Sequence, residues 1–178
     1  PQIVKTLEAC RLIEEDPSVT LDDLGSKVGL SAAHLQRTFK EIIGVSPKKF
    51  AENKRLERFK KEINAGSEVT AAMYDAGFGS SSRLYENVSS KLGMTPKAYA
   101  KKGKNMIIDF TITDCELGKL LVARTEKGAC AVTFGDEADE LREKLFNEYS
   151  NATFTEDAGE LGEYVAQIVG NINGTEKS

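Results

Sequence analysis

An internal repeat of about 50 residues constrains this chain of 178 residues more than any other feature of its sequence. At an offset of 49 residues, the segment that begins at Ser31 matches the segment that begins at Ser80. The matched pairs are Leu35 and Leu84, Phe39 and Val88, Gly44 and Gly93, Pro47 and Pro96, and Phe50 and Tyr99. Two copies are too few for a solenoid, which usually needs three or more. The repeat therefore indicates two equivalent units within one domain.

Each copy has the pattern of a helix, a tight glycine turn and a second helix. In the first copy Ser31 is a favourable N-cap for the second helix, and Leu35, Phe39 and Ile42 are spaced to form one buried stripe. The other faces of this helix then carry small, amide and basic side chains. Arginine pairs with guanine and glutamine with adenine in the major groove, so the pattern favours a DNA-binding helix-turn-helix. An ordinary helical hairpin is the alternative.

A helix rich in lysine and arginine is expected between the two copies, over residues 47–65. Its basic side chains could follow the phosphate backbone of DNA. They could equally pair at helical spacing with Glu52, Glu57 and Glu62 and form an ordinary solvated face. A further helix is expected before the first copy, over residues 2–15, with Ile3, Leu7 and Cys10 along its buried side.

Charge divides the chain into two halves. Residues 1–104 carry 18 Lys and Arg against 13 Asp and Glu, a net charge of +5, and residues 105–178 carry 6 against 15, a net charge of −9. A basic half suits phosphate contacts, so we expect two domains with different partners. No apolar run is long enough to span a membrane. The three cysteines are far apart and show no zinc spacing, which fits a reducing, cytoplasmic environment.

The acidic half predicts a small α+β domain. Alternating Ile108, Phe110 and Ile112 indicate a strand over residues 106–113. Two more strands are expected at residues 119–125 and 129–134, two helices at about 137–149 and 159–171, and a short extended piece near 153–154. We expect the three strands to form a meander with the helices against one face.

Two resemblances to known families emerge from these motifs. Residues 29–47, with the pattern Gly-Leu-Ser-x-x-His-Leu-Gln-Arg-x-Phe-Lys and then Gly-x-Ser-Pro, resemble the AraC/XylS family of transcription regulators. Residues 113–136 resemble the ribonuclease-like lead domain of methylated-DNA–protein-cysteine methyltransferases. The expected organisation is an all-α domain at residues 1–102, with helix-turn-helix motifs at about 20–47 and 69–96, a linker at 103–106 and the ribonuclease-like domain at 107–178.

This domain order resembles the Ada-type family of bifunctional transcription regulators and alkylation-repair proteins. The resemblance implies a sequence-specific regulator that binds promoter DNA as a monomer in the response to alkylation damage, with RNA polymerase as a candidate second partner. The family's zinc belongs to an N-terminal domain that this sequence lacks, so no cofactor is expected. Two alternatives stay open. The chain is a fragment of a methyltransferase whose acceptor cysteine lies beyond residue 178, or its C-terminal domain senses a small molecule.

The resemblance also implies which residues contact DNA. They are Ser31, Ala33, His34, Gln36, Arg37 and Lys40 in the first motif, and Ser80, Ser81, Ser82, Arg83 and Tyr85 in the second. Arg37 and Gln36 occupy base-reading positions, whereas the serines and Arg83 suit phosphate and sugar. Glu86 stands where the first copy has Arg37, and a carboxylate repels phosphate. We therefore expect the first motif to carry most of the sequence specificity.

We expect no alkyl-accepting cysteine among these residues. An activated thiol needs a base or a cationic partner, and the one histidine of the sequence, His34, lies in the other half. Acidic residues flank Cys115, and Cys130 alternates with Val132 and Phe134 as core residues do. The family's Pro-Cys-His-Arg acceptor motif does not occur in residues 1–178, so the chain by itself is not expected to be an enzyme.

Overall fold

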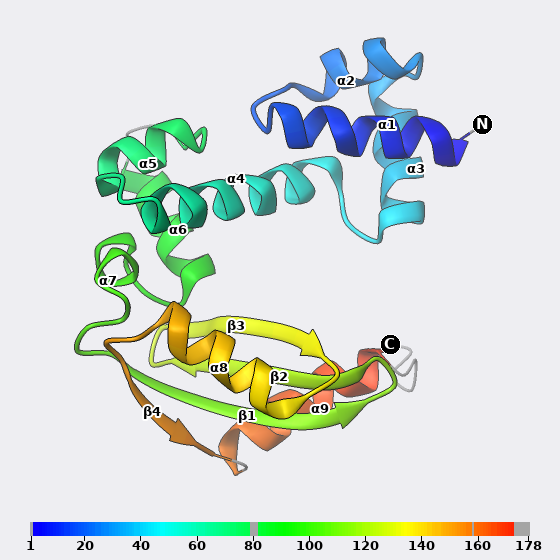
Figure 1. Ribbon diagram of the computed structural model, residues 1–178. Helices are drawn as coiled ribbons and strands as arrows, with labels where there is room; N and C mark the ends of the chain where they lie inside the picture. The colour runs from blue at the N-terminus through cyan, green and yellow to red at the C-terminus, as the bar shows by residue number, and fades with distance from the viewer. Residues whose placement is uncertain (1, 79–81, 158, 173–178) are drawn as a thin grey trace. The chain divides into compact units, whose positions relative to one another are not determined.

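The computed structural model describes residues 2–78, 82–157 and 159–172 (Figure 1). The chain forms two compact units, residues 1–80 and 81–178. The division falls between the two helices of the second predicted helix-turn-helix, and the predicted linker at residues 103–106 lies inside the second unit. The predicted helix-turn-helix domain at residues 1–102 and the compact unit at residues 1–80 therefore end at different residues.

The first unit is helical, and three of its described helices begin at a hydroxyl N-cap. Its helices are α1 (Gln2–Glu15), α2 (Leu21–Val28), α3 (Ala32–Ile43), α4 (Pro47–Asn64) and α5 (Val69–Asp75). The hydroxyls of Thr20, Ser31 and Ser46 each accept a hydrogen bond from the backbone N–H three residues on, as N-caps do. Helices α2 and α3 both end at a glycine with positive φ.

The core of the first helix-turn-helix joins α1, α2, α3 and the start of α4. Its buried side chains are Ala9, Ile13, Leu24, Val28, Leu35, Phe39 and Ala51. The predicted burial of Ile3 and Leu7 is wrong, because α1 turns Thr6, Ala9 and Ile13 inward and leaves Ile3 61% and Leu7 56% exposed. Ile42 is also exposed, and Thr38 takes its place on the buried face of α3.

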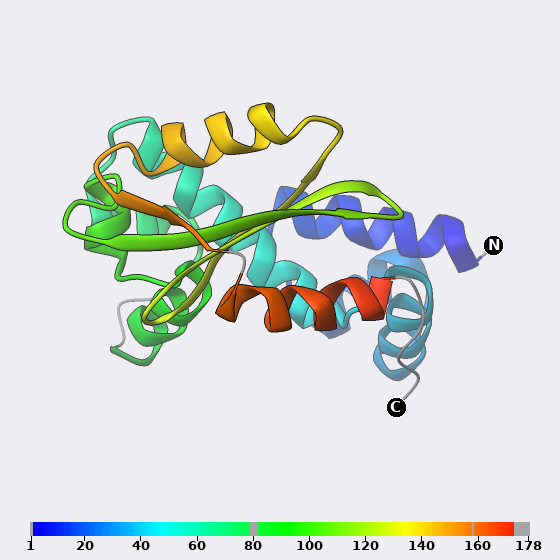
Figure 2. The same ribbon diagram turned by 90° about the horizontal axis from the view of Figure 1, so that it is seen from below.

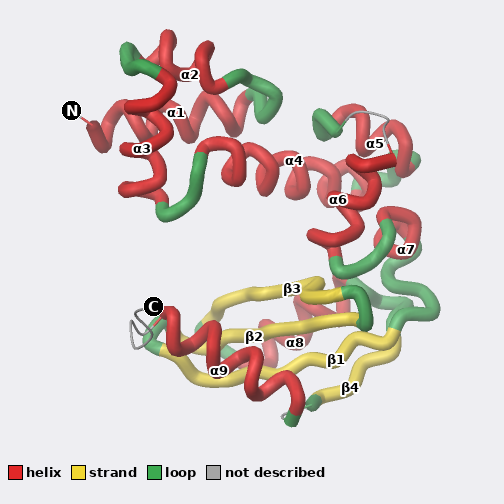
Figure 3. Tube along the Cα trace, turned by 180° about the vertical axis from the view of Figure 1, so that it is seen from behind, coloured by secondary structure: helices red, strands yellow, loops and turns green. Residues whose placement is uncertain are grey.

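The second unit combines helices with a mixed sheet (Figure 3). Its elements are α6 (Ser82–Leu92), α7 (Pro96–Ala100), β1 (Ile107–Cys115), β2 (Gly118–Thr125), β3 (Gly128–Gly135), α8 (Ala138–Glu148), β4 (Thr153–Glu156) and α9 (Glu160–Ile172). The strand order is β3-β2-β1-β4. The first three strands form the predicted antiparallel meander, and β4 joins β1 in parallel as a fourth strand that the sequence analysis counted only as an extended piece.

The two long helices of this unit cover opposite faces of the sheet (Figure 2). Leu120 and Val122 of β2 pack against α9. On the other face, Gly135 lies against Leu141 of α8. The expectation of both helices on one face is therefore wrong. It failed because alternate residues of a strand face opposite sides, and both sides of these strands are apolar.

The edge strand β3 departs from a second expectation. Val132 and Phe134 were predicted as core residues beside Cys130, but they are 47% and 42% exposed. Val132 pairs with Val122 and Phe134 with Leu120, so both lie on the side of the sheet that α9 covers. Helix α9 packs mainly on β1 and β2, so the edge at β3 is less covered.

Candidate nucleic-acid interface

The turn between α2 and α3 is built around two glycines. Gly29 adopts φ +66, and the N–H of Leu30 donates to the carbonyl of Gly25 at 2.9 Å. A Cβ on Gly25 would lie 2.6 Å from the carbonyl oxygen of Leu30, so only glycine allows α2 to pack this closely on the turn. The ammonium of Lys5 on α1 also donates to the carbonyl of Gly29 at 2.9 Å. Sequence reasoning missed both Gly25 and Lys5, because their partners are set by tertiary packing.

The second copy repeats this turn. Gly77 adopts φ +81, and the N–H of Phe78 donates to the carbonyl of Met73 at 2.9 Å. Met73 and Gly25 are equivalent at the offset of 48 that aligns the two turns. The repeat seen in the sequence is therefore a repeat of backbone geometry.

The outer face of α3 presents a basic stripe. Ala33, Arg37 and Lys40 recur at intervals of four and three, so they lie on one side of the helix, and all three are exposed. Neither Arg37 nor Lys40 has a hydrogen-bond or ion-pair partner among the residues that the structure describes. The opposite side of α3 buries Leu35 and Phe39 completely. A helix held this firmly by one face, with free cations on the other, has the geometry of a major-groove reader.

The remaining predicted residues of this motif flank the stripe. Ser31 is the N-cap, and its hydroxyl accepts from the N–H of His34 at 3.3 Å. The His34 ring lies toward α1, with Nε2 3.5 Å from the amide nitrogen of Gln2. Gln36 lies on the opposite flank, where it lines a hollow between α2 and α4 with a volume of about 390 Å³. His34 and Gln36 are thus at the margins of the face that Arg37 and Lys40 define.

The second motif is described less completely. Ser80 and Ser81 lie outside the described residues, and Ser82 and Arg83 are placed in the first turn of α6 by their backbone alone. Tyr85 is half-buried and Glu86 is exposed, while Val88 and Leu92 are fully buried. The exposed carboxylate of Glu86 therefore stands at the position that Arg37 holds in α3, as the repeat predicts.

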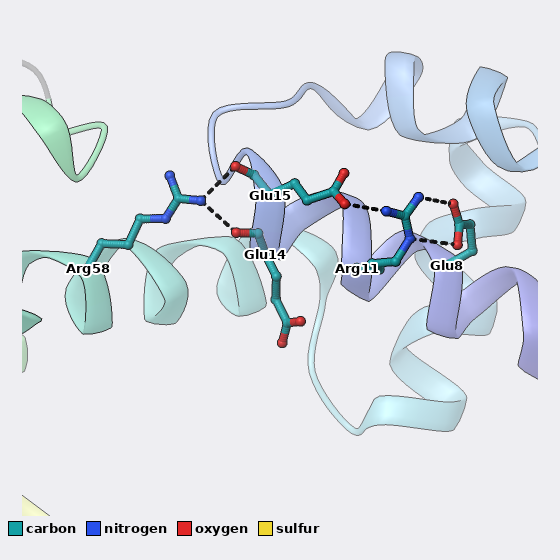
Figure 4. A network of polar contacts seen from close by, with 5 residues as sticks. All are labelled: Glu8, Arg11, Glu14, Glu15 and Arg58. Atoms are coloured by element: carbon teal, nitrogen blue, oxygen red, sulfur yellow. Dashed lines mark hydrogen bonds and ion pairs between the residues drawn. The ribbon is translucent and has the colours of Figure 1, made fainter.

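Three basic residues of α4 are bonded within the protein, which decides for them whether they face DNA phosphates or pair with neighbouring groups. The guanidinium of Arg58 donates to the carbonyls of Glu14 and Glu15, both at 2.6 Å, at the C-terminal end of α1 (Figure 4). Arg55 donates two hydrogen bonds to the carbonyl of Pro17. The carbonyls of Glu14 and Glu15 have no partner inside the helix, so Arg58 caps α1, while Arg55 binds the loop that follows it. Lys54 lies 3.1 Å from carboxylate oxygens of both Glu14 and Glu57.

Further ion pairs lie on the outside of α1. Arg11 forms ion pairs with Glu8 and Glu15 on the same helix (Figure 4). The hydrogen bond from Arg11 lowers the pKa of Glu8. For Lys54, partial burial lowers the pKa, but the hydrogen bonds to Glu57 and Glu14 outweigh it and raise the pKa overall. Arg11 and Lys54 are therefore neutralised locally, unlike Arg37 and Lys40.

The cysteines have the surroundings of structural residues. Burial, followed by the charge of Glu14, raises the pKa of Cys10. Cys115 packs against the cluster between β2 and α9, and Cys130 is 6% exposed. Within residues 2–78, 82–157 and 159–172, no three His, Cys, Asp or Glu side chains are grouped as a metal site requires. Across that same part of the chain, no helix has both the length and the apolar character needed to cross a membrane.

Two family models match the chain, and together they define its class. A helix-turn-helix domain matches residues 24–102. The ribonuclease-like domain of 6-O-methylguanine DNA methyltransferase matches residues 108–177. The chain therefore combines a helix-turn-helix domain with a following domain that matches the ribonuclease-like domain of 6-O-methylguanine DNA methyltransferase.

Three relatives are similar to this chain over different lengths. The chain is 34% identical over 169 residues to the bifunctional transcriptional activator/DNA repair enzyme Ada of Escherichia coli, which covers 95% of this chain and 48% of the relative. It is 37% identical over 165 residues to the regulatory protein ada of Salmonella typhimurium, covering 93% and 47%. An uncharacterized HTH-type transcriptional regulator, YbfI of Bacillus subtilis, is 33% identical over 77 residues, covering 42% and 28%. The chain thus spans about half the length of the two Ada proteins.

Proposed function

We propose that this chain binds duplex promoter DNA through its two helix-turn-helix motifs and regulates transcription in the response to DNA alkylation. The observation that carries the proposal is the outer face of α3, where Arg37 and Lys40 are exposed and unpaired within the described structure while Leu35 and Phe39 hold the helix from behind. The link to alkylation rests on the methyltransferase lead domain and on the names of the Ada relatives.

The proposal divides the cations of the first unit into two groups. Arg37 would reach a base edge and Lys40 a phosphate, since both are exposed on the reader face. Arg55 and Arg58 would contribute little to DNA binding, because their guanidinium groups are engaged with carbonyls of α1 and the following loop. The acidic second domain would add no phosphate contacts of its own. The expected monomeric state, the cytoplasmic location and a contact with RNA polymerase belong to the same proposal.

The test is a binding titration with a duplex that the chain itself selects from a random pool. Arg37→Ala should weaken binding by roughly 5- to 150-fold, the loss of about 1–3 kcal/mol expected for one bidentate base contact. Lys40→Ala should reduce the slope of log K against log salt by about 0.9. Arg11→Ala is the matched control, because it removes the same charge from the same unit but from an ion-paired site on α1. A chain that enriches no duplex, or equal losses for Arg37→Ala and Arg11→Ala, would refute the proposal.

A further inference from the structure

The turn that ends α6 lies directly on the hairpin between β2 and β3. Gly93 adopts φ +64 and is buried. A Cβ at this position would lie 2.7 Å from the carbonyl oxygens of both Gly128 and Ala129. The hydroxyl of Thr125 donates a hydrogen bond to the carbonyl of Gly93, and Thr125 is itself only 5% exposed. The backbone of the reader motif and the backbone of the hairpin are therefore in direct contact.

Helix α7 makes a second contact with the same domain. The ring of Tyr99 packs edge-on against the ring of Tyr149, with centroids 5.8 Å apart and an interplanar angle of 81°. The Tyr99 hydroxyl donates to a carboxylate oxygen of Glu148 at 3.0 Å, and the Tyr149 hydroxyl donates to the carbonyl of Cys130 at 3.0 Å. Both tyrosines are essentially inaccessible to solvent. Burial is also the main cause that raises the pKa of Tyr149.

A third contact fixes the segment after α7. The backbone N–H of Asn151 donates to the carbonyl of Lys102 at 2.9 Å. Its side-chain amide donates to the carbonyl of Lys101 at 3.1 Å. The segment from Gly93 to Lys102 is thus held at both ends and in the middle by residues of the methyltransferase lead domain.

The first copy of the repeat differs at two equivalent positions. A Cβ on Gly44, the counterpart of Gly93, would meet no atom within 4 Å. Phe50, the counterpart of Tyr99, packs its ring on Phe39 of its own reader helix, with centroids 5.5 Å apart. At these two positions the first copy therefore makes no contact outside its own helical unit, whereas the second packs against the lead domain.

We propose that the lead domain is the positioning platform of the second DNA-reading helix, with Thr125, Tyr149 and Asn151 acting on α6 through Gly93, Tyr99 and the segment that follows α7. These residues touch no DNA. They set the position from which α6 presents its first turn to the groove. The inference rests on the proposed function, because it concerns how the second motif reaches its segment of the site.

The test uses the full chain and a selected duplex that contains two protected segments. The platform variant combines Tyr99→Phe with Thr125→Val, which removes two hydroxyls that bond across the contact. The matched control combines Tyr164→Phe with Thr111→Val. It removes the same atoms from the exposed side of α9 and from the central strand β1. Three measurements are compared: hydroxyl-radical footprints, DNA affinities and the amide hydrogen exchange of α6. All are made without denaturant, at a temperature where circular dichroism shows that every variant is folded.

The platform variant should lose protection of one segment and keep the other. It should bind the two-segment duplex about 5- to 30-fold more weakly, the effect of losing one or two hydrogen bonds of about 1 kcal/mol each, and exchange the amides of α6 faster. The control should match the original chain. Unchanged footprints, affinity and α6 exchange in the platform variant would overturn the inference, as would loss of both segments together. If the platform variant does not fold, Asn151→Ala at the exposed edge of the contact must show the same one-segment loss. Failure of the original chain to bind any duplex would instead refute the proposed function.

Discussion

Replacing Gly93 by alanine gives the sharpest test of how closely α6 and the β2–β3 hairpin are packed. Two costs add at this position. An L-residue at positive φ is strained by about 1–2 kcal/mol relative to glycine. The new Cβ would also lie 2.7 Å from two carbonyl oxygens, where ordinary contact begins at 3.4 Å. Because these are backbone atoms, the chain must separate by several tenths of an ångström.

The magnitude follows from what the separation breaks. Overpacking of this kind costs about 1–3 kcal/mol, and the loss of the hydrogen bond from Thr125 to Gly93 costs about 1 kcal/mol more. The expected total is about 3–6 kcal/mol for Gly93→Ala. Gly44→Ala is the matched control, because Gly44 has φ +85 and open space around its Cβ position. It should cost about 1–2 kcal/mol, the strain alone.

Urea unfolding measures the difference. With a slope of about 1–3 kcal/mol per molar urea, the extra cost at Gly93 should lower the midpoint by about 1 M or more beyond the shift of Gly44→Ala. The chain has five tyrosines and no tryptophan. Four of the five, all but Tyr74, belong to the second unit, so tyrosine fluorescence follows the unit that contains Gly93, and circular dichroism follows the helical unit that contains Gly44. Equal midpoint shifts in the two variants would show that the hairpin does not press on Gly93, and the packing argument would fail.

Four further results are expected. Arg58→Ala should destabilise the first unit by about 1–3 kcal/mol, because it uncaps α1, whereas Lys61→Ala on the same helix should cost under about 0.5 kcal/mol; thermal unfolding checks the pair. The pKa of Tyr149 is raised above the ordinary value of 10.0 for tyrosine, so the folded chain keeps this hydroxyl neutral where the unfolded chain ionises it. The contribution of Tyr149 to stability is therefore complete below pH 10 and is lost as the pH rises above 10. In Tyr149→Phe the alkaline loss of stability should be shallower. Glu86→Arg should tighten DNA binding and steepen its salt dependence by about 0.9, and unchanged binding would contradict the assigned roles of α3 and α6. Mass spectrometry after incubation with methylated DNA should find all three cysteines unmodified, and a methylated Cys115 would refute the structural reading of that residue.

Local signals were enough to predict the frame of the reader motifs. The hydroxyl cap at Ser31 and the tight glycine turn before it depend only on neighbouring residues, and the structure has both as predicted. The repeat also makes Glu86 the equivalent of Arg37, and both side chains are exposed on their helices.

Features that depend on distant partners could not be predicted in this way. Ile3 and Leu7 have the spacing of a buried stripe, yet α1 buries Ala9 and Ile13 instead because those residues meet α2 and α3. The roles of Arg55 and Arg58 depend on where α1 ends in space. The pairing of β4 with β1 joins residues about 46 positions apart, and no local pattern specifies it.

Contact with Asn151 also sets an order of events during synthesis of the chain. The core of the first reader is complete once Ala51 has been added. The last anchor of the second reader, Asn151, follows about 100 residues later, which corresponds to roughly 5–20 s of translation. The helical first unit can fold on local contacts, while α6 must wait for strands and a helix that do not yet exist. A nascent chain therefore completes its first helix-turn-helix motif well before its second.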